Sequence, residues 1–189
     1  MTTVAVLDYG MGNLHSVAKA LEHVGATKVI VTHDPALVRS ADRVVFPGVG
    51  AMRDCIAGMK AVGVDEEVRE AAKQKPALAI CVGMQALMNH SEENGGVDCL
   101  GMFAGKVKFF GNDLVENGER LKVPHMGWNT AQVCREHPLV ADWDEESRFY
   151  FVHSFHVVAR DMDAVLAKTD YGVTIHSILG RENIMGVQF

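Results

Sequence analysis

The sequence predicts an α/β fold in which a mainly parallel, open sheet carries helices on both faces and gains antiparallel additions in its second half. In the first half, short and wholly apolar runs alternate with segments whose apolar residues recur at helical spacing, which is the pattern of strand–helix–strand units. The 189 residues are 48% hydrophobic, enough for one sizeable core. Because no internal repeat or linker is visible, we expect a single domain over residues 1–189.

The apolar runs of the first half are typical of strands buried on both faces of a parallel sheet. We expect these strands at residues 4–7, 28–31, 44–46 and 77–81. Segment 14–21 carries apolar residues every three or four positions, which predicts a helix that ends near Gly25. Asp34 before Pro35 predicts the N-cap and first position of a short helix. A longer helix is expected over residues 65–74.

The second half changes character after a polar loop at residues 91–96. Aromatic and β-branched residues dominate its apolar runs, and this composition favours strands over helices. We expect these strands at residues 103–110, 130–134, 149–156, 164–169, 173–179 and 184–189. They would form the other side of the same sheet, with antiparallel pairs.

The segment over residues 77–85 is the one that carries chemistry. An apolar run stops at Cys81, Gly83 follows two places on, and a helix-forming stretch comes next. This order predicts a strand, a tight turn and a helix start, as in a nucleophile elbow with cysteine in the place of serine. A helix N-terminus there would favour the thiolate. The alternative is a buried cysteine that only packs, since free cysteines are often buried.

A second turn, Pro47-Gly48-Val49-Gly50, follows the strand expected at residues 44–46. Its glycines leave backbone N–H groups free at the carboxyl end of a strand, which is what an oxyanion stabiliser needs. A plain turn has the same composition. The site interpretation gains weight because Cys81 is expected at the same edge, where ligands bind in open α/β sheets.

Composition excludes several classes of function. A net charge of −6 and a pI of about 5.8 argue against a nucleic-acid or anionic-membrane surface. No apolar stretch approaches the roughly 20 residues that span a bilayer. The four cysteines form no Cys-x-x-Cys pair, so neither zinc nor a disulfide framework is expected. Gly10-x-Gly12 lacks the third glycine of a dinucleotide fingerprint, where His15 stands. We expect a cytoplasmic protein without a metal or cofactor.

Four motifs carry a resemblance to a known family: the turn at residues 47–50, the elbow at Cys81, the string Pro124-His125-Met126-Gly127-Trp128-Asn129, and Tyr150-Phe151-Val152-His153-Ser154. With them the chain resembles the class I glutamine amidotransferases. Within that family it is most similar to the glutaminase subunits of imidazole glycerol phosphate synthases. The likeness runs from Asp8-Tyr9-Gly10 to Gly186-Val187-Gln188-Phe189.

The resemblance implies a mechanism in which Cys81 attacks the side-chain amide of glutamine, giving a glutamyl thioester and ammonia. It also implies roles for residues around the nucleophile. The implied oxyanion donors are the N–H groups of Val49, Gly50 and Val82. The implied substrate-binding residues are Gly48, Gly50, Gln85, His153 and Ser154.

The resemblance further implies a protein partner, a cyclase subunit with a (βα)8 barrel that forms a heterodimer with this chain and receives the ammonia. The residues that match the family's partner-facing surface are Asn13, His125, Met126, Gly127, Trp128 and Asn129. An exposed tryptophan beside glycine suits such a contact, because tryptophan concentrates interface energy.

The sequence departs from the family pattern in two places. Ala79 stands where related elbows commonly carry glycine, a difference of one methyl group. The family pattern also continues after Gly-Val-Gln-Phe with His-Pro-Glu, whose histidine and glutamate complete the triad, whereas this sequence stops at Phe189. We therefore expect a C-terminally truncated domain with little or no activity of its own, unless His156 replaces the missing base.

Two hypotheses of different classes follow. The chain is either the glutaminase subunit of an ammonia-transferring enzyme or an amidotransferase-like binding module without catalysis. A glutaminase of pyridoxal phosphate synthase is a further alternative, against which the string at residues 124–129 argues.

Overall fold

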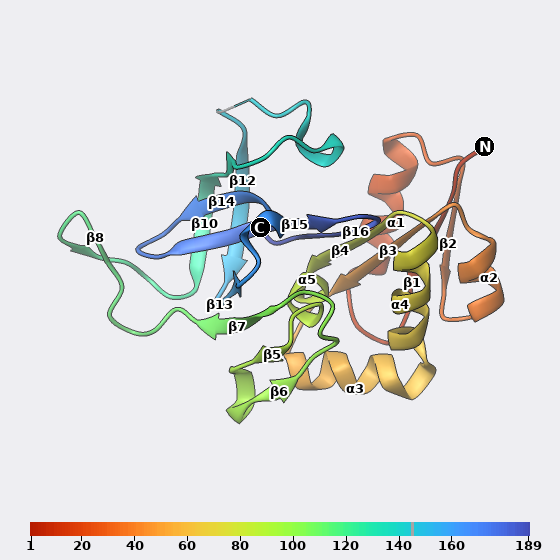
Figure 1. Cartoon of the computed structure of the whole chain (residues 1–189), viewed down its shortest axis with the longest axis horizontal. Helices are drawn as coiled ribbons and strands as arrows, with labels where there is room; N and C mark the ends of the chain where they lie inside the picture. The colour runs from red at the N-terminus through yellow and green to blue at the C-terminus, as the bar shows by residue number, and fades with distance from the viewer. Residues whose placement is uncertain (145) are drawn as a thin grey trace.

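The structure, a computed structural model, describes residues 1–144 and 146–189. Its first half alternates strands and helices as expected (Figure 1). The expected strands and helices of this half are present, each within about two residues of its expected end. The elements are β1 (Thr3–Leu7), α1 (Leu14–His23), β2 (Lys28–Thr32), α2 (Pro35–Ser40), β3 (Arg43–Gly48), α3 (Met52–Val62), α4 (Val64–Gln74), β4 (Ala77–Cys81) and α5 (Val82–Ala86).

The main sheet has eight strands in the order β11-β14-β15-β16-β4-β3-β1-β2. The strands from β2 to β16 (Ile184–Val187) pair in parallel, whereas β16, β15 (Thr174–Arg181), β14 (Val165–Asp170) and β11 (Gln132–Val133) pair antiparallel. This arrangement confirms the predicted parallel sheet with antiparallel additions.

Side-chain alternation along the parallel strands builds one core on each face of the sheet. On one face, Ala5 and Leu7 pack with buried residues of α2, α3 and α4. On the other face, Val4 and Val6 pack with apolar residues of α1. The helices therefore cover both faces, as the continuous apolar runs predict.

One helix was not anticipated. In α3 the buried residues are Met52, Cys55, Ile56 and Met59, which recur at the three- and four-residue spacing of an amphipathic helix. Gly63, with φ of 73°, ends α3 and begins α4 without a loop. The spacing was a usable signal for this helix in the sequence.

The second half differs from the prediction in its sheets. Only part of it extends the main sheet. The rest forms a four-stranded sheet and two small ribbons, because several strands are only two residues long and pair locally. The remaining elements are β5 (His90–Ser91), β6 (Val97–Asp98), β7 (Gly105–Phe109), β8 (Val115–Glu116), β9 (Glu119–Arg120), β10 (His125–Thr130), β12 (Arg148–His153) and β13 (Phe155–Ala159), with 3-10 turns at Glu93–Gly95, Pro138–Val140 and Met162–Ala164.

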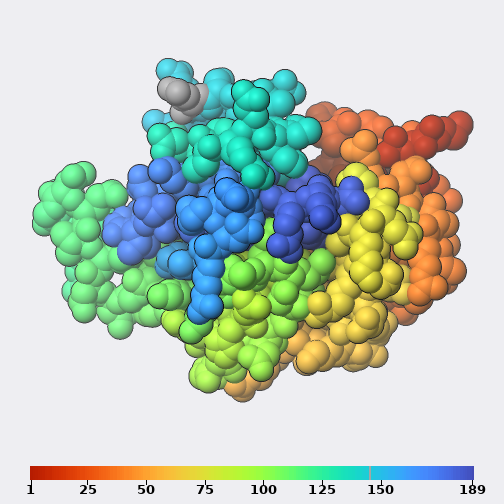
Figure 2. Space-filling view, viewed as in Figure 1, coloured from red at the N-terminus to blue at the C-terminus, as the bar shows by residue number. Residues whose placement is uncertain are grey.

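The expected strand over residues 149–156 is in fact two strands that separate at Ser154. β12 pairs with β10 in a two-stranded ribbon, whereas β13 pairs with β7 in the four-stranded sheet. The expected strand over residues 130–134 likewise divides between β10 and β11. The β8–β9 hairpin projects from the body of the molecule (Figure 2). None of the helices in the described ranges combines the length and apolarity needed to cross a bilayer.

Candidate active site

Cys81 ends β4, and α5 begins at the next residue. Its backbone has φ of 57° and ψ of −117°, a region that L-residues rarely adopt and that occurs where the surrounding structure enforces it. The side chain is half-buried. This is the geometry of the predicted elbow, with the sulfur held at the carboxyl edge of the parallel strands.

Two glycines let the elbow lie against the neighbouring strand. A Cβ added to Gly83 would overlap the carbonyl oxygen of Phe46, and one added to Gly48 would stand 2.6 Å from Gly83 N. Both distances are too short for a real side chain. The close backbone approach expected of Gly83 is therefore confirmed, and Gly48 makes the same contact from the opposite side.

The Pro47–Gly50 turn lies beside Cys81 because β3 and β4 are neighbours. Gly48 pairs with Cys81 in the register of the two parallel strands. Beyond the strand, Val49 is exposed and Gly50 has φ of +84°. A Cβ on Gly50 would come within 2.9 Å of Met11 Cε, so the loop after β1 touches this turn.

The sulfur's environment differs from the expectation of a stabilised thiolate. Burial raises the pKa of Cys81, and this effect outweighs the Val82 N–H and the Gln188 amide, which both lower it. Because α5 has only five residues, its dipole is small. The thiol form is therefore favoured in the isolated chain.

Two residues near the elbow were not singled out as site residues from the sequence. The Tyr9 hydroxyl donates to the carbonyl oxygen of Pro47 at 2.5 Å and lies 3.5 Å from Cys55 Sγ, so it fastens the start of the glycine turn. Gln188 is 1% exposed, and neither polar atom of its side chain makes a hydrogen bond of ordinary geometry, although its amide is near enough to Cys81 to lower that pKa. Both residues lie in motifs that carry the family resemblance. That resemblance was the only feature of the sequence that pointed to them.

Gln85 and His153, two of the expected substrate-binding residues, converge on one carbonyl group. Gln85 Nε2 donates to Phe155 O at 3.1 Å, and His153 Nδ1 lies 2.9 Å from the same oxygen. Both side chains are buried. Ser154 is half-buried and lies between His153 and Phe155 in sequence, where β12 ends and β13 begins.

Among the residues that the structure describes, no histidine is hydrogen-bonded to the Cys81 sulfur. His156, considered as a substitute base, is buried and stacks on Phe110 with ring centroids 4.7 Å apart. Its Nδ1 has no hydrogen-bond partner, and burial lowers its pKa to about 4. His156 therefore belongs to an aromatic cluster and does not activate Cys81 in this arrangement.

The expected partner-facing string lies on β10, where residues alternate between two faces. Met126 and Trp128 are 60% and 66% exposed. Across the ribbon they pair with Val152 and Tyr150, which are also exposed. These four residues form one apolar surface, which we call the ribbon face. Gly127 lies between its two β10 members.

The side chains of His125 and Asn129, also expected at the partner surface, are not on the ribbon face. His125 is 3% exposed and stacks between Phe151 and Tyr171. Asn129 Nδ2 donates to the carbonyl oxygen of Asp170. Strand alternation turns both inward. Asn13 lies elsewhere and serves as the N-cap of α1, accepting from Ser16 N at 3.3 Å.

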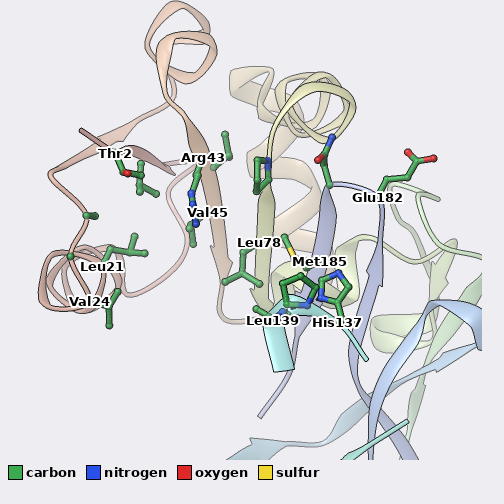
Figure 3. A pocket seen from close by; sticks show the side chains of 17 residues that line it. Thr2, Leu21, Val24, Arg43, Val45, Leu78, His137, Leu139, Glu182 and Met185 are labelled. Carbon is green, nitrogen blue, oxygen red and sulfur yellow. Dashed lines mark hydrogen bonds between the residues drawn. The ribbon is translucent and has the colours of Figure 1, made fainter. Parts of the chain in front are cut away.

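A large cavity of about 620 Å³ lies at the opposite, amino-terminal edge of the parallel strands (Figure 3). Val4, Val44 and Leu78 line it from the beginnings of β1, β3 and β4. It is therefore separate from the Cys81 edge. In the described part of the chain, no group of three or more His, Cys, Asp or Glu residues could hold a metal ion.

The elbow and the glycine turn accord with the result of comparing the sequence with protein families. The glutamine amidotransferase class-I family matches residues 5–189. The chain belongs to this family. The match covers nearly the whole chain and agrees with the resemblance drawn from the motifs.

Curated relatives from this amidotransferase family share more than half of the sequence. The protein "Imidazole glycerol phosphate synthase subunit HisH" of Pseudomonas putida is 58% identical over 189 residues, which is 100% of this chain and 89% of the relative. The protein of the same name from Acinetobacter baylyi is 57% identical over 100% of this chain and 90% of the relative.

Solved amidotransferase structures share the fold. A glutamine amidotransferase from Thermotoga maritima has a TM-score of 0.64 at 13% identity, covering 100% of this chain and 75% of that one. The structure of PurLQS from the same organism has a TM-score of 0.67 at 16% identity, and the match covers 99% of this chain and 86% of that one. At these identities the likeness concerns the fold alone.

Proposed function

We propose that this chain is the glutaminase subunit of an imidazole glycerol phosphate synthase, which hydrolyses glutamine to glutamate and ammonia. The observation that carries the proposal is the strained Cys81 elbow lying in register with Gly48, in a chain 58% identical to a relative of that name. The ammonia passes to a cyclase subunit that makes imidazole glycerol phosphate and AICAR in histidine biosynthesis. A cytoplasmic location is part of this proposal, because it suits a biosynthetic role of this kind.

In the proposed mechanism, the Cys81 thiolate attacks the side-chain carbonyl carbon of glutamine and forms a tetrahedral oxyanion. The C–N bond then breaks, and the nitrogen leaves as ammonia after it gains a proton. Water attacks the resulting glutamyl thioester, which releases glutamate and restores the thiol. Each turnover consumes one glutamine and one water.

Backbone N–H groups of Val82 and of the Val49–Gly50 turn stabilise the oxyanion in this proposal. One such donor contributes about 3 kcal/mol to lowering a barrier, so its orientation can separate an active site from an idle one. Gly50 has a positive φ, and glycine permits the peptide before it to reorient. Gly48 is different, because it lies in close contact with Gly83, with no space even for a Cβ.

Glutamine would lie between the elbow and the junction of β12 and β13. Gln85, His153 and Ser154 are the proposed substrate-binding residues there, together with the backbone of Gly48 and Gly50. Because Gln85 and His153 are buried and already bonded to Phe155 O, they would act mainly by shaping the pocket wall.

The thiol must lose a proton before it can attack. Burial raises the pKa of Cys81, and the described residues offer it no histidine partner. We therefore propose that this polypeptide turns glutamine over very slowly in the arrangement described, since a thiol with a raised pKa and no base beside it is seldom ionised. The same observation favours the alternative of a non-catalytic binding module. A glutaminase of pyridoxal phosphate synthase is less favoured, because the chain carries the string at residues 124–129.

The partner in this proposal is a cyclase subunit with a (βα)8 barrel, forming a heterodimer through the ribbon face. Trp128 and Met126 would supply most of the binding energy, since large exposed apolar side chains dominate such contacts. Gly127 would allow close approach. Asn13 would contribute from the loop that touches Gly50 through Met11.

Release of ammonia from amide-¹⁵N-labelled glutamine tests the proposed reaction. The chain is mixed with the cyclase subunit and its ligand, and ¹⁵N-ammonium is followed by NMR. We expect slow release that disappears in Cys81→Ala and persists in Cys134→Ala, since Cys134 is an exposed cysteine away from the elbow. Equal release from Cys81→Ala would overturn the proposal, and no release from the wild type would favour the binding module.

A further inference from the structure

Three hydrogen bonds connect the ribbon to the elbow helix. His125 Nδ1 on β10 lies 3.3 Å from His153 Nε2 on β12. His153 Nδ1 lies 2.9 Å from Phe155 O on β13. The same oxygen accepts from Gln85 Nε2 on α5, at 3.1 Å. The chain of contacts therefore begins beside the ribbon face and ends on the helix that starts at Cys81.

The chemistry of these atoms fixes where each proton lies. A carbonyl oxygen only accepts, so His153 Nδ1 carries its proton and donates to Phe155 O. Both rings are buried, and burial lowers the pKa of each, for His125 to about 4. Each ring is thus neutral and holds one proton. His153 Nε2 is therefore an acceptor, and His125 Nδ1–H must be its donor.

Aromatic packing holds the two rings in this arrangement. The His125 ring lies between Phe151 and Tyr171, with centroid distances of 4.6 and 3.8 Å and near-parallel planes. Phe110 meets His153 edge-on at 5.1 Å. A ring fixed on both faces transmits a movement of its strand to its hydrogen-bond partner, because packed side chains cannot absorb the shift.

We propose that His125 is a positioning residue that couples protein docking on the ribbon face to the elbow, through His153, Phe155 O and Gln85. This inference rests on the proposed function, because it assumes a partner on the ribbon face and a nucleophile at Cys81. His125 is adjacent to Met126 in β10, so a partner that shifts Met126 shifts the His125 backbone. Gln85 lies within α5, four residues after Cys81.

Two variants separate the hydrogen bond from the packing. His125→Phe keeps an aromatic ring between Phe151 and Tyr171 but removes the donor. His125→Asn places an amide donor near the position of Nδ1. For each variant, the rate of Cys81 alkylation is measured with and without the cyclase subunit, together with the affinity of the complex. Imidazole ¹⁵N shifts report the tautomer of His153 independently of any activity.

We expect His153 in the Nδ1–H form, and a Cys81 alkylation rate that changes about tenfold on adding the cyclase, the usual scale of such coupling. His125→Phe should reduce this change to less than twofold while affinity stays within threefold, and His125→Asn should restore it. A His153 Nε2–H tautomer, or full coupling in His125→Phe, would overturn the inference alone. A wild-type chain that neither binds the cyclase nor responds to it would overturn the proposed function and this inference together.

Discussion

Cys81 holds a backbone conformation that costs an L-residue of order 1–3 kcal/mol. Its neighbours include two glycines, Gly48 and Gly83, whose missing side chains let β3 and α5 touch. The tight turn at Cys81 and the close approach at Gly83 could be predicted from sequence, because a strand that stops at Cys-x-Gly is a local pattern. Tyr9 could not be assigned a site role from any local pattern, because its partner Pro47 is 38 residues away.

The strain at Cys81 predicts an unusual order of stabilities. Cys81→Gly should be more stable than Cys81→Ala by about 1 kcal/mol, because glycine adopts a positive φ without steric cost. Position 79 lies in the same strand and has an ordinary φ. The variant Ala79→Gly should therefore be less stable than the wild type, by about the same amount. Chemical denaturation of the four proteins measures both differences. An Ala variant at position 81 as stable as the Gly variant would contradict a strained elbow.

Gly83→Ala should destabilise the fold by about 2–3 kcal/mol, because the new methyl group overlaps the backbone oxygen of Phe46, which cannot move alone. Gly180→Ala is the matched control. Its methyl group meets the end of the Leu166 side chain, at 2.6 Å, and not a backbone atom, so we expect a smaller loss. Denaturant midpoints of the two variants give the comparison, and equal losses would show that the elbow contact is not tight.

The ribbon of β10 and β12 shows what a motif can and cannot specify. The string at residues 124–129 indicated a partner surface, but it did not separate outward from inward side chains. Once the segment is known to be a strand, its two-residue period places Met126 and Trp128 outside and His125 inside. The exact ends of the strand supply that information, and they depend on pairing with residues 18 to 28 positions away.

Trp128→Ala should weaken binding of the cyclase subunit about 30-fold, or about 2 kcal/mol, because an exposed tryptophan at the centre of an apolar surface is a typical hot spot. Its stability should change little. Val24→Ala provides the control, since Val24 is 77% exposed at the end of α1, outside the ribbon face. Calorimetric titration measures both affinities. Similar affinities for Trp128→Ala and wild type would exclude the ribbon face as the interface.

For the whole molecule, the predicted alternation of strands and helices was correct in the first half of the chain. There each strand or helix packs against elements that are near it in sequence. It was incomplete in the second half, where two-residue strands such as β5 and β6 have too little pattern to be recognised. Strand partners there are also distant in sequence, as β11 and β14 show. Local residue patterns do not encode such pairings.

Burial of several histidines predicts that the fold is acid-sensitive. Burial lowers the pKa of His156 to about 4, with smaller contributions from His153, His176 and Lys108. In the unfolded chain its pKa is about 6.5. The unfolded state therefore binds the proton first as the pH falls. The stabilisation is complete above about pH 6.5 and is lost progressively between pH 6.5 and 4.

The titration of His156 should lower the free energy of unfolding by up to about 2 kcal/mol at pH 5 relative to pH 7.5. His156→Phe keeps the stack on Phe110 and removes the titration, so its unfolding free energy should fall less over that range. Urea unfolding at several pH values measures the difference. A variant with the same pH dependence as the wild type would mean that His156 is not buried in its neutral form.

The central claim is that Cys81 is the nucleophile for glutamine, and site-resolved labelling tests it most directly. The chain is treated with a diazoketone analogue of glutamine in the presence of the cyclase subunit and its ligand, and the four cysteines are compared by peptide mass spectrometry. We predict modification of Cys81, protection of Cys81 by glutamine, and no glutamine-sensitive labelling of the more exposed Cys134. Labelling of Cys134 in preference to Cys81, unaffected by glutamine, would contradict the claim.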